Sequence, residues 1–412
     1  MINKKQTKIE LLAPAGNMLK MKTALFYGAD AVYLGIPDFS LRVRINDFDL
    51  NGIKTAIEYA HKLKKKVYVT VNIFAHNRHI KLLPKYLKKI AEFKADGLII
   101  SDPGIITLAK KYCPKIAIHL STQASCTNAA AVAFWQKQGV KRIVLGREVT
   151  LNEIKEMHKT CPKMELEYFV HGAMCMAYSG RCFLSKEVLG RSANLGDCVQ
   201  PCRWEYDVNI KAKGHDEVFE LVEEPHGTYL LNSNDLCLIK QIKDLMKAGV
   251  SSFKIEGRAK SVYYIANLAG IYKEAINHPA KIDFLFDELK EKLVHRGYTT
   301  GFLLGDKATQ NIDNANNQAP WEFCGQVTEA EKIAAGKYLL LVAVHNTLKN
   351  GDDVEIILPN YDIIKLNLKE MIDAKTGEVL AEAHGGGGGQ TILLEVNSKK
   401  PILPLTVLRR RL

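Results

Sequence analysis

The sequence lacks long apolar runs. No stretch of its 412 residues approaches the roughly 18 consecutive apolar residues that a membrane helix needs. The first ten residues, MINKKQTKIE, are charged and contain neither an apolar core nor a cleavage site, so we expect no secretory signal. These absences predict a cytoplasmic protein that does not bind a membrane, in a compartment where thiols are kept reduced.

Several catalytic signatures are missing as well. The chain has no HExxH zinc-protease motif and no C-x2-C redox pair, and Ser179 and Ser185 do not lie in a G-x-S-x-G elbow. The first apolar run continues as APAGN, which is not the G-x-G-x-x-G of a dinucleotide-binding turn. The residues therefore give proteolysis little support, and the missing glycine fingerprint disfavours a doubly wound open sheet.

Cysteine is sparse except in one stretch, His171–Tyr206, which holds four of the nine cysteines and is rich in Gly, Ser and Arg, as a loop is. A reduced compartment and an odd total make a disulfide framework unlikely to form. The spacings C-x6-C, C-x15-C and C-x3-C fit paired zinc knuckles poorly, and Glu205 interrupts a C-x3-C-x2-C motif. An iron–sulfur cluster, a zinc site and unligated cysteines all remain open from spacing alone.

Short apolar runs alternate with segments of helical periodicity, which predicts a (β/α)8 barrel. A doubly wound open sheet is the alternative. The eight expected strands are Ile9–Ala13, Ala31–Gly35, Val67–Ile73, Gly97–Ser101, Ile116–Ser121, Arg142–Gly146, Leu166–His171 and Ser252–Glu256.

The predicted domains are unequal in size. The barrel domain covers residues 1–305 and carries the cysteine-rich insertion, about 172–250, after its seventh strand. Within this insertion we expect a hairpin in Asp207–Glu224, a short strand at Thr228–Leu231 and a helix cap at Ser233 or Asp235. Residues 306–320 read as a linker, and residues 321–412 predict a small antiparallel β-barrel domain.

Polar side chains follow the expected strands, and in a barrel they converge on the rim where such enzymes keep their active sites. Arginines in this set suit a carboxylate or phosphate, and the net charge of +12 suits an RNA partner. The substrate-binding candidates are Arg42, Arg44, Asn72, Gln123, Arg147, Arg181 and Arg258; the catalytic candidates are Glu148, His171 and Glu256.

The chain resembles the collagenase-like peptidase U32 family over about its first 300 residues. The resemblance is carried by ELLAPAGN, GADAVYLG, SLRVR, ISDPG, HLSTQAS, EYFVHGAMCMAYSGRCFLS, CRWEY, NSNDLC, KIEGRAKSVYY and HRGYTTGF. It is similar to the branch that hydroxylates tRNA. That resemblance implies conversion of the wobble uridine to 5-hydroxyuridine, with a [4Fe–4S] cluster as cofactor and prephenate as co-substrate.

The resemblance also implies ligands for the cluster. Cys175, Cys182 and Cys198 match family ligands, and the fourth is Cys237 or Cys202, of which Cys237 is preferred. Arg42, Arg147 and Arg258 become candidates for a dicarboxylate such as prephenate. The alternatives are a U32-type peptidase, an RNA-binding module without chemistry, and hydroxylation of ribosomal RNA or a quinone precursor.

Overall fold

The computed structural model describes most of the chain, and all statements below concern that part. The described residues are 9–41, 46–175, 177–206, 208–211, 218–221, 232–305, 309–311, 316–317, 319–386 and 389–412, with backbone alone described at 208–211 and 218–221. No helix among them is both long enough and apolar enough to cross a membrane. Contacts divide the chain into two compact units: residues 1–21, 30–259 and 294–317, and residues 22–29, 260–293 and 318–412.

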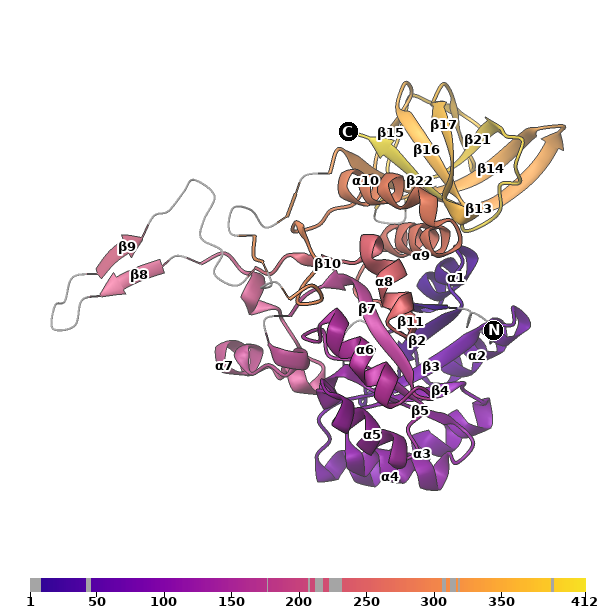
Figure 1. The fold of residues 1–412 in the computed structure, drawn as a ribbon. Coiled ribbons are helices and arrows are strands. Elements are labelled where there is room, and N and C mark those ends of the chain that lie inside the picture. Colours follow the sequence, from indigo (N-terminus) through magenta and orange to yellow (C-terminus); the bar gives the residue numbers. More distant parts are fainter. Residues whose placement is uncertain are drawn as a thin grey trace. The chain divides into compact units, whose positions relative to one another are not determined.

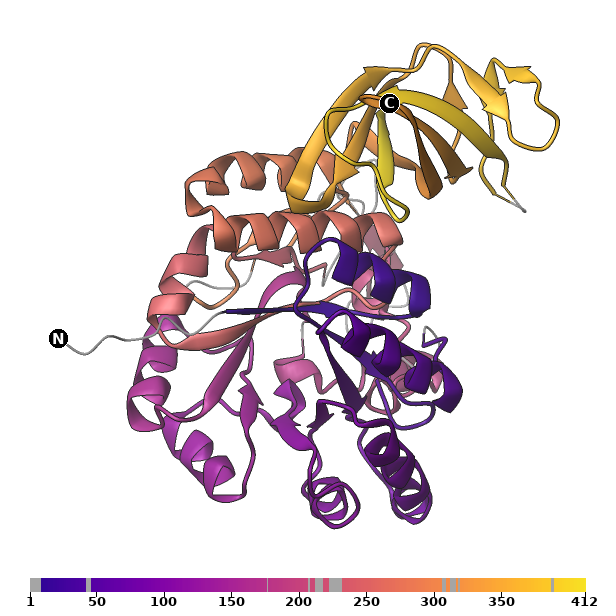
Figure 2. The ribbon, with the colours of Figure 1, turned by 90° about the vertical axis from the view of Figure 1, so that its right-hand side faces the viewer.

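Eight parallel strands form a closed barrel in the first unit (Figure 2). Each strand pairs with the next along the chain, and the last pairs with both the seventh and the first, which closes the ring. The predicted (β/α)8 barrel is confirmed. Its strands are β1 (Glu10–Pro14), β2 (Ala31–Gly35), β3 (Lys66–Val71), β4 (Gly97–Ile100), β5 (Ala117–Leu120), β6 (Arg142–Val144), β7 (Glu165–Ala173) and β11 (Val250–Ile255).

Helices connect these strands because apolar residues recur there at helical spacing and a polar side chain starts several of them. Asp49, Asp102, Asn128 and Thr150 each accept a hydrogen bond from a backbone N–H of the first turn. The helices are α1 (Met18–Phe26), α2 (Leu50–Lys62), α3 (Asn77–Phe93), α4 (Pro103–Tyr112), α5 (Ala129–Lys137), α6 (Leu151–Thr160) and α8 (Ile242–Lys247) (Figure 1).

A charged network fills part of the barrel interior and joins the strands that close it. Arg142 on β6 pairs with Glu10 on β1 and with Glu167 on β7, at 2.5 and 3.1 Å. Lys254 on β11 pairs with Glu167 at 2.8 Å, and Ser252 donates to the same carboxylate. Burial alone would raise the pKa of Glu167, but Lys254 and Arg142 lower it overall. These charges satisfy one another, as buried charges must.

The excursion after β7 is long, and the elements in its described part are short. They are η3 (Tyr178–Gly180), α7 (Leu184–Leu189), η4 (Ala193–Leu195), η5 (Pro201–Arg203), the expected hairpin β8 (Val208–Lys211) and β9 (Val218–Leu221), and β10 (Asp235–Cys237). The helix cap predicted at Ser233 or Asp235 is wrong, because these residues lead into a strand that runs antiparallel to β7. The predicted strand at 228–231 lies outside the described residues. β12 (Tyr298–Thr299) pairs with β10.

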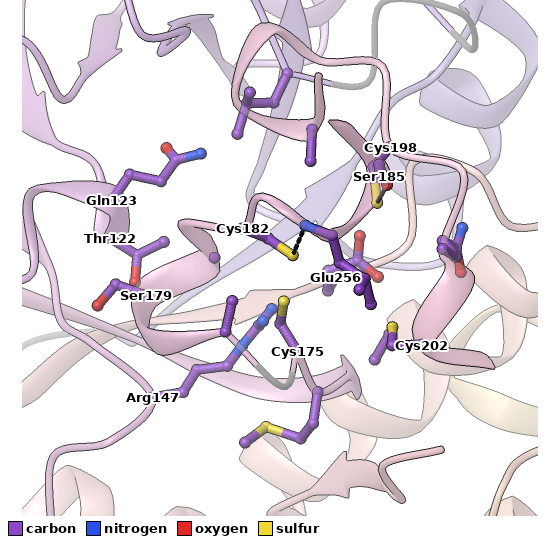
Figure 3. Close-up of a pocket in the computed structure, with 18 of the residues that line it drawn as sticks. Thr122, Gln123, Arg147, Cys175, Ser179, Cys182, Ser185, Cys198, Cys202 and Glu256 are labelled. Carbon is purple, nitrogen blue, oxygen red and sulfur yellow. Dashed lines mark hydrogen bonds between the residues drawn. The ribbon is translucent and has the colours of Figure 1, made fainter. Parts of the chain in front are cut away.

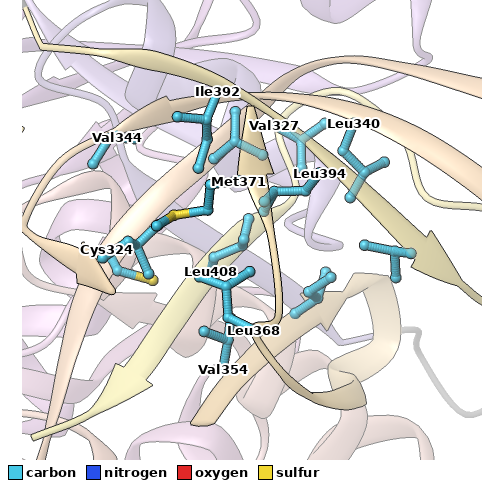
Figure 4. Close-up of a cluster of buried hydrophobic side chains, with 14 of the residues drawn as sticks. Cys324, Val327, Leu340, Val344, Val354, Leu368, Met371, Ile392, Leu394 and Leu408 are labelled. Carbon is cyan, nitrogen blue, oxygen red and sulfur yellow. The ribbon is translucent and has the colours of Figure 1, made fainter. Parts of the chain in front are cut away.

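The second unit contains an antiparallel sheet, which confirms the predicted small β domain. Its order is β17-β16-β22-β13-β14-β21-β18-β19, and alternate side chains along its strands enclose an apolar core that includes Val327, Leu340, Met371 and Leu394 (Figure 4). The strands are β13 (Trp321–Ala334), β14 (Lys337–Val344), β16 (Asp353–Leu358), β17 (Asp362–Asn367), β18 (Met371–Asp373), β19 (Val379–Leu380), β21 (Thr391–Asn397) and β22 (Val407–Arg411); β15 (Leu348–Lys349) and β20 (Glu382–Ala383) form a separate pair.

The helices α9 (Val262–Asn277) and α10 (Ile282–Lys292) group with this sheet rather than with the barrel. Arg409 on β22 is fully buried and binds Glu355 on β16 and Glu288 on α10. It also donates to the hydroxyl of Tyr361 at 3.0 Å. The same guanidinium donates to Oδ1 of Asn267 on α9 at 3.4 Å, so it holds both helices and the sheet together within the unit.

Candidate functional site

A pocket lies at the carboxyl ends of the barrel strands. Residues from four strand ends contribute to it: Gln123 after β5, Arg147 and Glu148 after β6, Ala173 at the end of β7, and Glu256 after β11. Thr122 and Leu41 also line it, and the excursion after β7 supplies the remaining residues. The pocket therefore lies where barrel enzymes place their active sites.

Four thiols face this pocket, which has a volume of about 170 Å³. They belong to Cys175, Cys182, Cys198 and Cys202, and Figure 3 shows their sulfur atoms turned toward a shared space beside Glu256. Burial raises the pKa of the Cys202 thiol; Arg203 lowers it, and the three other thiols raise it further. The structure thus brings four sulfurs together from 28 residues of sequence, Cys175 to Cys202.

Hydrogen bonds within the excursion orient two of these sulfurs. The backbone N–H of Leu184 donates to Sγ of Cys182 at 3.4 Å, and the hydroxyl of Ser185 lies 3.7 Å from Sγ of Cys198. Ser185 also accepts from the N–H of Val199 at 3.3 Å. These contacts fix where the two sulfur atoms lie relative to the pocket.

Glu148 fixes the conformation of the excursion near its start. Ser179 is in the left-handed region at φ 49°, which a residue with a side chain rarely adopts. Its N–H donates to the Glu148 carboxylate at 2.6 Å and its hydroxyl donates to the same group at 3.4 Å. The carboxylate that was expected to be catalytic is therefore engaged in holding the loop, while it still lines the pocket.

Gly172 allows the ends of β7 and β11 to approach closely. Its φ is 121°, and a Cβ at this position would lie 2.7 Å from Cβ of Glu256 and 2.8 Å from the Glu256 carbonyl oxygen. The N–H of Glu256 donates to the carbonyl of His171 at 2.9 Å. Only glycine at position 172 leaves room for Glu256 to lie against the end of β7. In this position Glu256 lines the pocket.

His171 and Cys237 lie together, but neither lines the pocket. Cys237 on β10 is opposite His171 on β7, and both are buried. The ring of His171 meets the ring of Tyr298 edge to face, with centroids 5.4 Å apart. Gly172 and Ala173 separate His171 from the start of the thiol loop. His171 and Cys237 are therefore adjacent to the pocket but do not line it.

The predicted arginines divide into different roles. Arg147 lines the pocket with its guanidinium 4.0 Å from the centroid of the Phe169 ring. Its Nε is buried and has no hydrogen-bond partner in the part of the chain that the structure describes. Arg181 donates twice to the backbone carbonyl of Gln123, and Arg258 donates to Ser40 at 2.9 Å and to the carbonyl of Leu41. Arg42 and Arg44 lie outside the described residues.

Two residues were missed by sequence reasoning. Arg203 and Gln200 line the pocket and bind each other, and Gln200 is in the left-handed region at φ 58°. The position of Arg203 directly after Cys202 was the available signal. The predicted Asn72 donates to the side chain of Gln123 at 3.0 Å, so it positions Gln123 and does not itself line the pocket.

Four thiols around one pocket are a donor set of the kind that thiolate-bound metal centres use. A single zinc ion holds thiolates at about 2.3 Å, which requires its ligands to converge tightly. Among the described residues, no three His, Cys, Asp or Glu side chains are placed to hold one metal ion. A [4Fe–4S] cluster is bound by four thiolates around a larger inorganic core. Four thiols around one pocket, two of them receiving hydrogen bonds, match that donor set.

The fold and the pocket define a barrel protein with a thiol-lined site at the carboxyl ends of its strands. The chain belongs to peptidase family U32: the model of that family matches residues 16–313, and the model of the family's C-terminal domain matches residues 319–409.

Relatives within the family have curated descriptions. The chain is 41% identical to tRNA hydroxylation protein P of Escherichia coli, over 92% of each chain. It is 32% identical to the 23S rRNA 5-hydroxycytidine C2501 synthase of the same organism, over 85% of this chain and 53% of that protein. A solved structure, the U32 peptidase Mk0906, aligns with a TM-score of 0.41 at 12% identity over 62% of this chain and 96% of its own.

Proposed function

We propose that this protein is an RNA-modifying hydroxylase that converts the wobble uridine of tRNA to 5-hydroxyuridine. The observation that carries the proposal is the set of four thiols around one pocket at the barrel rim, in a chain similar over nearly its whole length to a tRNA hydroxylation protein. The reaction replaces the C5–H of the base with C5–OH. Hydroxylation of ribosomal RNA is the second candidate, supported by the more distant ribosomal relative.

The proposed cofactor is a [4Fe–4S] cluster held by the thiols, which when bound supplies one-electron redox chemistry. Cys175, Cys182 and Cys198 supply three ligands. Cys202 lines the same pocket and is favoured by geometry as the fourth, whereas Cys237 is the candidate favoured by family resemblance. Cys237 is the register partner of His171 on the neighbouring strand and does not line the pocket.

The proposed co-substrate is prephenate, a dicarboxylate. Arg147 and Arg203 line the pocket, and guanidinium groups match carboxylates in charge and geometry. The guanidinium of Arg147 lies 4.0 Å from the centroid of the Phe169 ring, and its Nε has no hydrogen-bond partner among the described residues, so we take Arg147 as the first candidate for the anion-binding group. Near this position, Glu148 holds the loop by accepting from the N–H of Ser179. The backbone carbonyl of Gln123 accepts from Arg181 and so fixes that side chain.

The serines of the excursion support redox chemistry better than proteolysis. The hydroxyl of Ser185 contacts Sγ of Cys198 and accepts from Val199, and that of Ser179 donates to Glu148. Both hydroxyls thus make contacts that stabilise the loop carrying the thiols. If the protein were a peptidase, purified enzyme would cleave a defined peptide and Ser185→Ala would abolish the cleavage.

The test is complementation of a strain that lacks its own tRNA hydroxylase. Wild-type protein should restore 5-hydroxyuridine in total tRNA, measured by mass spectrometry of nucleosides, and Cys198→Ala should not. Cys161→Ala is the matched control, because Cys161 is buried at the end of α6 and does not line the pocket. Restoration by Cys198→Ala would contradict a role for the thiol pocket. A change confined to ribosomal RNA nucleosides would support the second candidate instead.

A further inference from the structure

Three large aromatic side chains of the excursion point into solvent. Phe183 is 77% exposed, Tyr178 57% and Trp204 38%. In contrast, the aromatic residues Tyr33, Tyr68 and Phe169 inside the barrel are buried. Soluble proteins seldom expose several large apolar side chains in one short segment unless that surface binds something.

Each of these aromatic residues is next to residues that line the thiol pocket. Tyr178 lies between Ala177 and Ser179, and Phe183 lies between Cys182 and Leu184. Trp204 directly follows Arg203, which also lines the pocket. Neighbours of all three residues therefore line the pocket, whereas the three aromatic side chains are exposed and are not among the lining residues.

The backbone around these positions is held in place. The contacts of Ser179 with Glu148 fix the segment that carries Tyr178. Phe183 is the N-cap residue of α7, and its carbonyl accepts from the N–H groups of Lys186 and Glu187, each at 2.9 Å. A backbone that is already ordered loses little conformational entropy when a partner binds, which favours a role of this segment in recognition.

We propose that Tyr178, Phe183 and Trp204 are stacking platforms for the unpaired bases on either side of the target base in an RNA loop. This inference rests on the proposed function and names the surface by which that substrate is held. A base must leave its stack to enter a pocket, and its neighbours then lose a stacking partner. Exposed aromatic rings beside the pocket replace that partner regardless of base identity.

The charge of the same segment favours RNA over an apolar partner. Arg181 and Lys186 are exposed and lie on either side of Phe183 in the sequence. Cations that alternate with aromatic rings match the alternation of phosphates and bases along a single strand. Val188 and Leu189 of the same segment are also exposed, so it is the cations, and not the apolar side chains alone, that favour RNA.

The experiment measures binding of an anticodon stem-loop RNA to the purified full-length protein. Phe183→Ala and Tyr178→Ala should each weaken binding about tenfold, as expected for the loss of one stacked base. Phe183→Trp should retain affinity and Phe183→Leu should not, because leucine keeps apolar character but has no π face. Phe134→Ala is the matched control, since Phe134 is 54% exposed on α5 and is not among the pocket-lining residues.

A second measurement does not depend on substitution at the loop. With Trp135 and Trp321 replaced by Phe, the remaining Trp204 should report the stem-loop by fluorescence quenching, and the same RNA annealed to its complement should quench much less. Full affinity in Phe183→Leu, or equal quenching by duplex and stem-loop, would overturn the proposal. Light scattering would detect self-association if this surface instead binds a second copy of the chain.

The two proposals fail in different ways. If tRNA from the complemented strain contains no 5-hydroxyuridine but the aromatic variants still lose stem-loop affinity, the hydroxylase proposal falls and the stacking surface stands. If modification is restored and the aromatic variants bind and turn over the RNA like wild type, only the stacking surface falls.

Discussion

The barrel interior and the thiol pocket are both polar, but they differ in how their groups are satisfied. In the interior, Arg142, Glu167 and Lys254 pair with one another and are buried. In the pocket, thiols face open space and Nε of Arg147 has no partner among the described residues. The comparison teaches that a polar group paired within the chain serves the fold, whereas one that faces a cavity is available to a ligand.

The largest effect on the fold should come from breaking the interior network. Arg142→Met leaves Glu10 and Glu167 with less compensation, which should lower the free energy of unfolding by about 3–5 kcal/mol, measured in urea. Lys89→Met is the control, because the Lys89–Glu92 pair is exposed and should contribute less than about 1 kcal/mol. Equal losses in both variants would show that the interior pairing adds nothing to stability.

Substitutions in the pocket should have the opposite pattern, with loss of cofactor at little cost in stability. We expect Cys202→Ala, prepared without oxygen, to bind less iron and to lose visible absorption, while Cys237→Ala keeps more of both, because Cys202 lines the pocket. Iron content per chain and the visible spectrum measure this. The reverse order would assign the fourth ligand to Cys237 and mean that β10 reaches the cluster.

A smaller effect is expected at the anion-binding position. Arg147→Lys keeps the charge but removes the planar fork and its stacking on Phe169, so the apparent affinity for prephenate should fall about tenfold. Arg181→Lys is the comparison variant, because Arg181 already donates to the carbonyl of Gln123. The concentration of prephenate that gives half-maximal tRNA hydroxylation is the measurement. An unchanged value in Arg147→Lys would remove this residue from the anion site.

The smallest effect concerns the dependence of stability on acid. The pKa of Glu167 is lowered in the folded barrel because Lys254 and Arg142 outweigh its burial. Its ion pairs therefore add stability above the pKa of the unfolded chain, about 4.3, and this stability is lost as the pH falls through the lower folded value. Glu167→Gln should be less stable at neutral pH but should lose less stability between about pH 5 and pH 3.

The measurement is urea unfolding at a series of pH values. Glu92→Gln removes the same charge from an exposed pair and controls for the change in net charge. If wild type and Glu167→Gln lose stability in parallel as the pH falls, the ion pairs of Glu167 do not contribute to the acid response.

The barrel could be predicted from sequence because its signals are local. Apolar runs such as Val67–Ile73 form strands buried on both faces, and cap residues such as Asp102 and Thr150 begin the helices between them. The same periodicity locates the strand ends, and it therefore predicted four residues that line the pocket: Gln123, Arg147, Glu148 and Glu256. Parallel strands in a barrel leave their carboxyl ends on one face, so order along the chain was sufficient.

The interior of the excursion could not be predicted in the same way. Its conformation depends on contacts between distant residues, such as Glu148 with Ser179 and Arg181 with the carbonyl of Gln123. Ser179 and Gln200 adopt the left-handed conformation although neither is glycine, so the sequence gives no local signal for a turn at these positions. The strand at Asp235–Cys237 could not be predicted from spacing, because it depends on how the chain returns to β7.

The return of β10 along β7 has a consequence for how the gene can change. Ala173 and Asp235 are register partners, so the two ends of the excursion are tied together at the barrel wall. Insertions or deletions between β8 and β9 then fall within an excursion whose two ends are anchored, and they add little closure entropy. We expect homologues to differ most in length at this hairpin, and a reporter peptide inserted there should be tolerated.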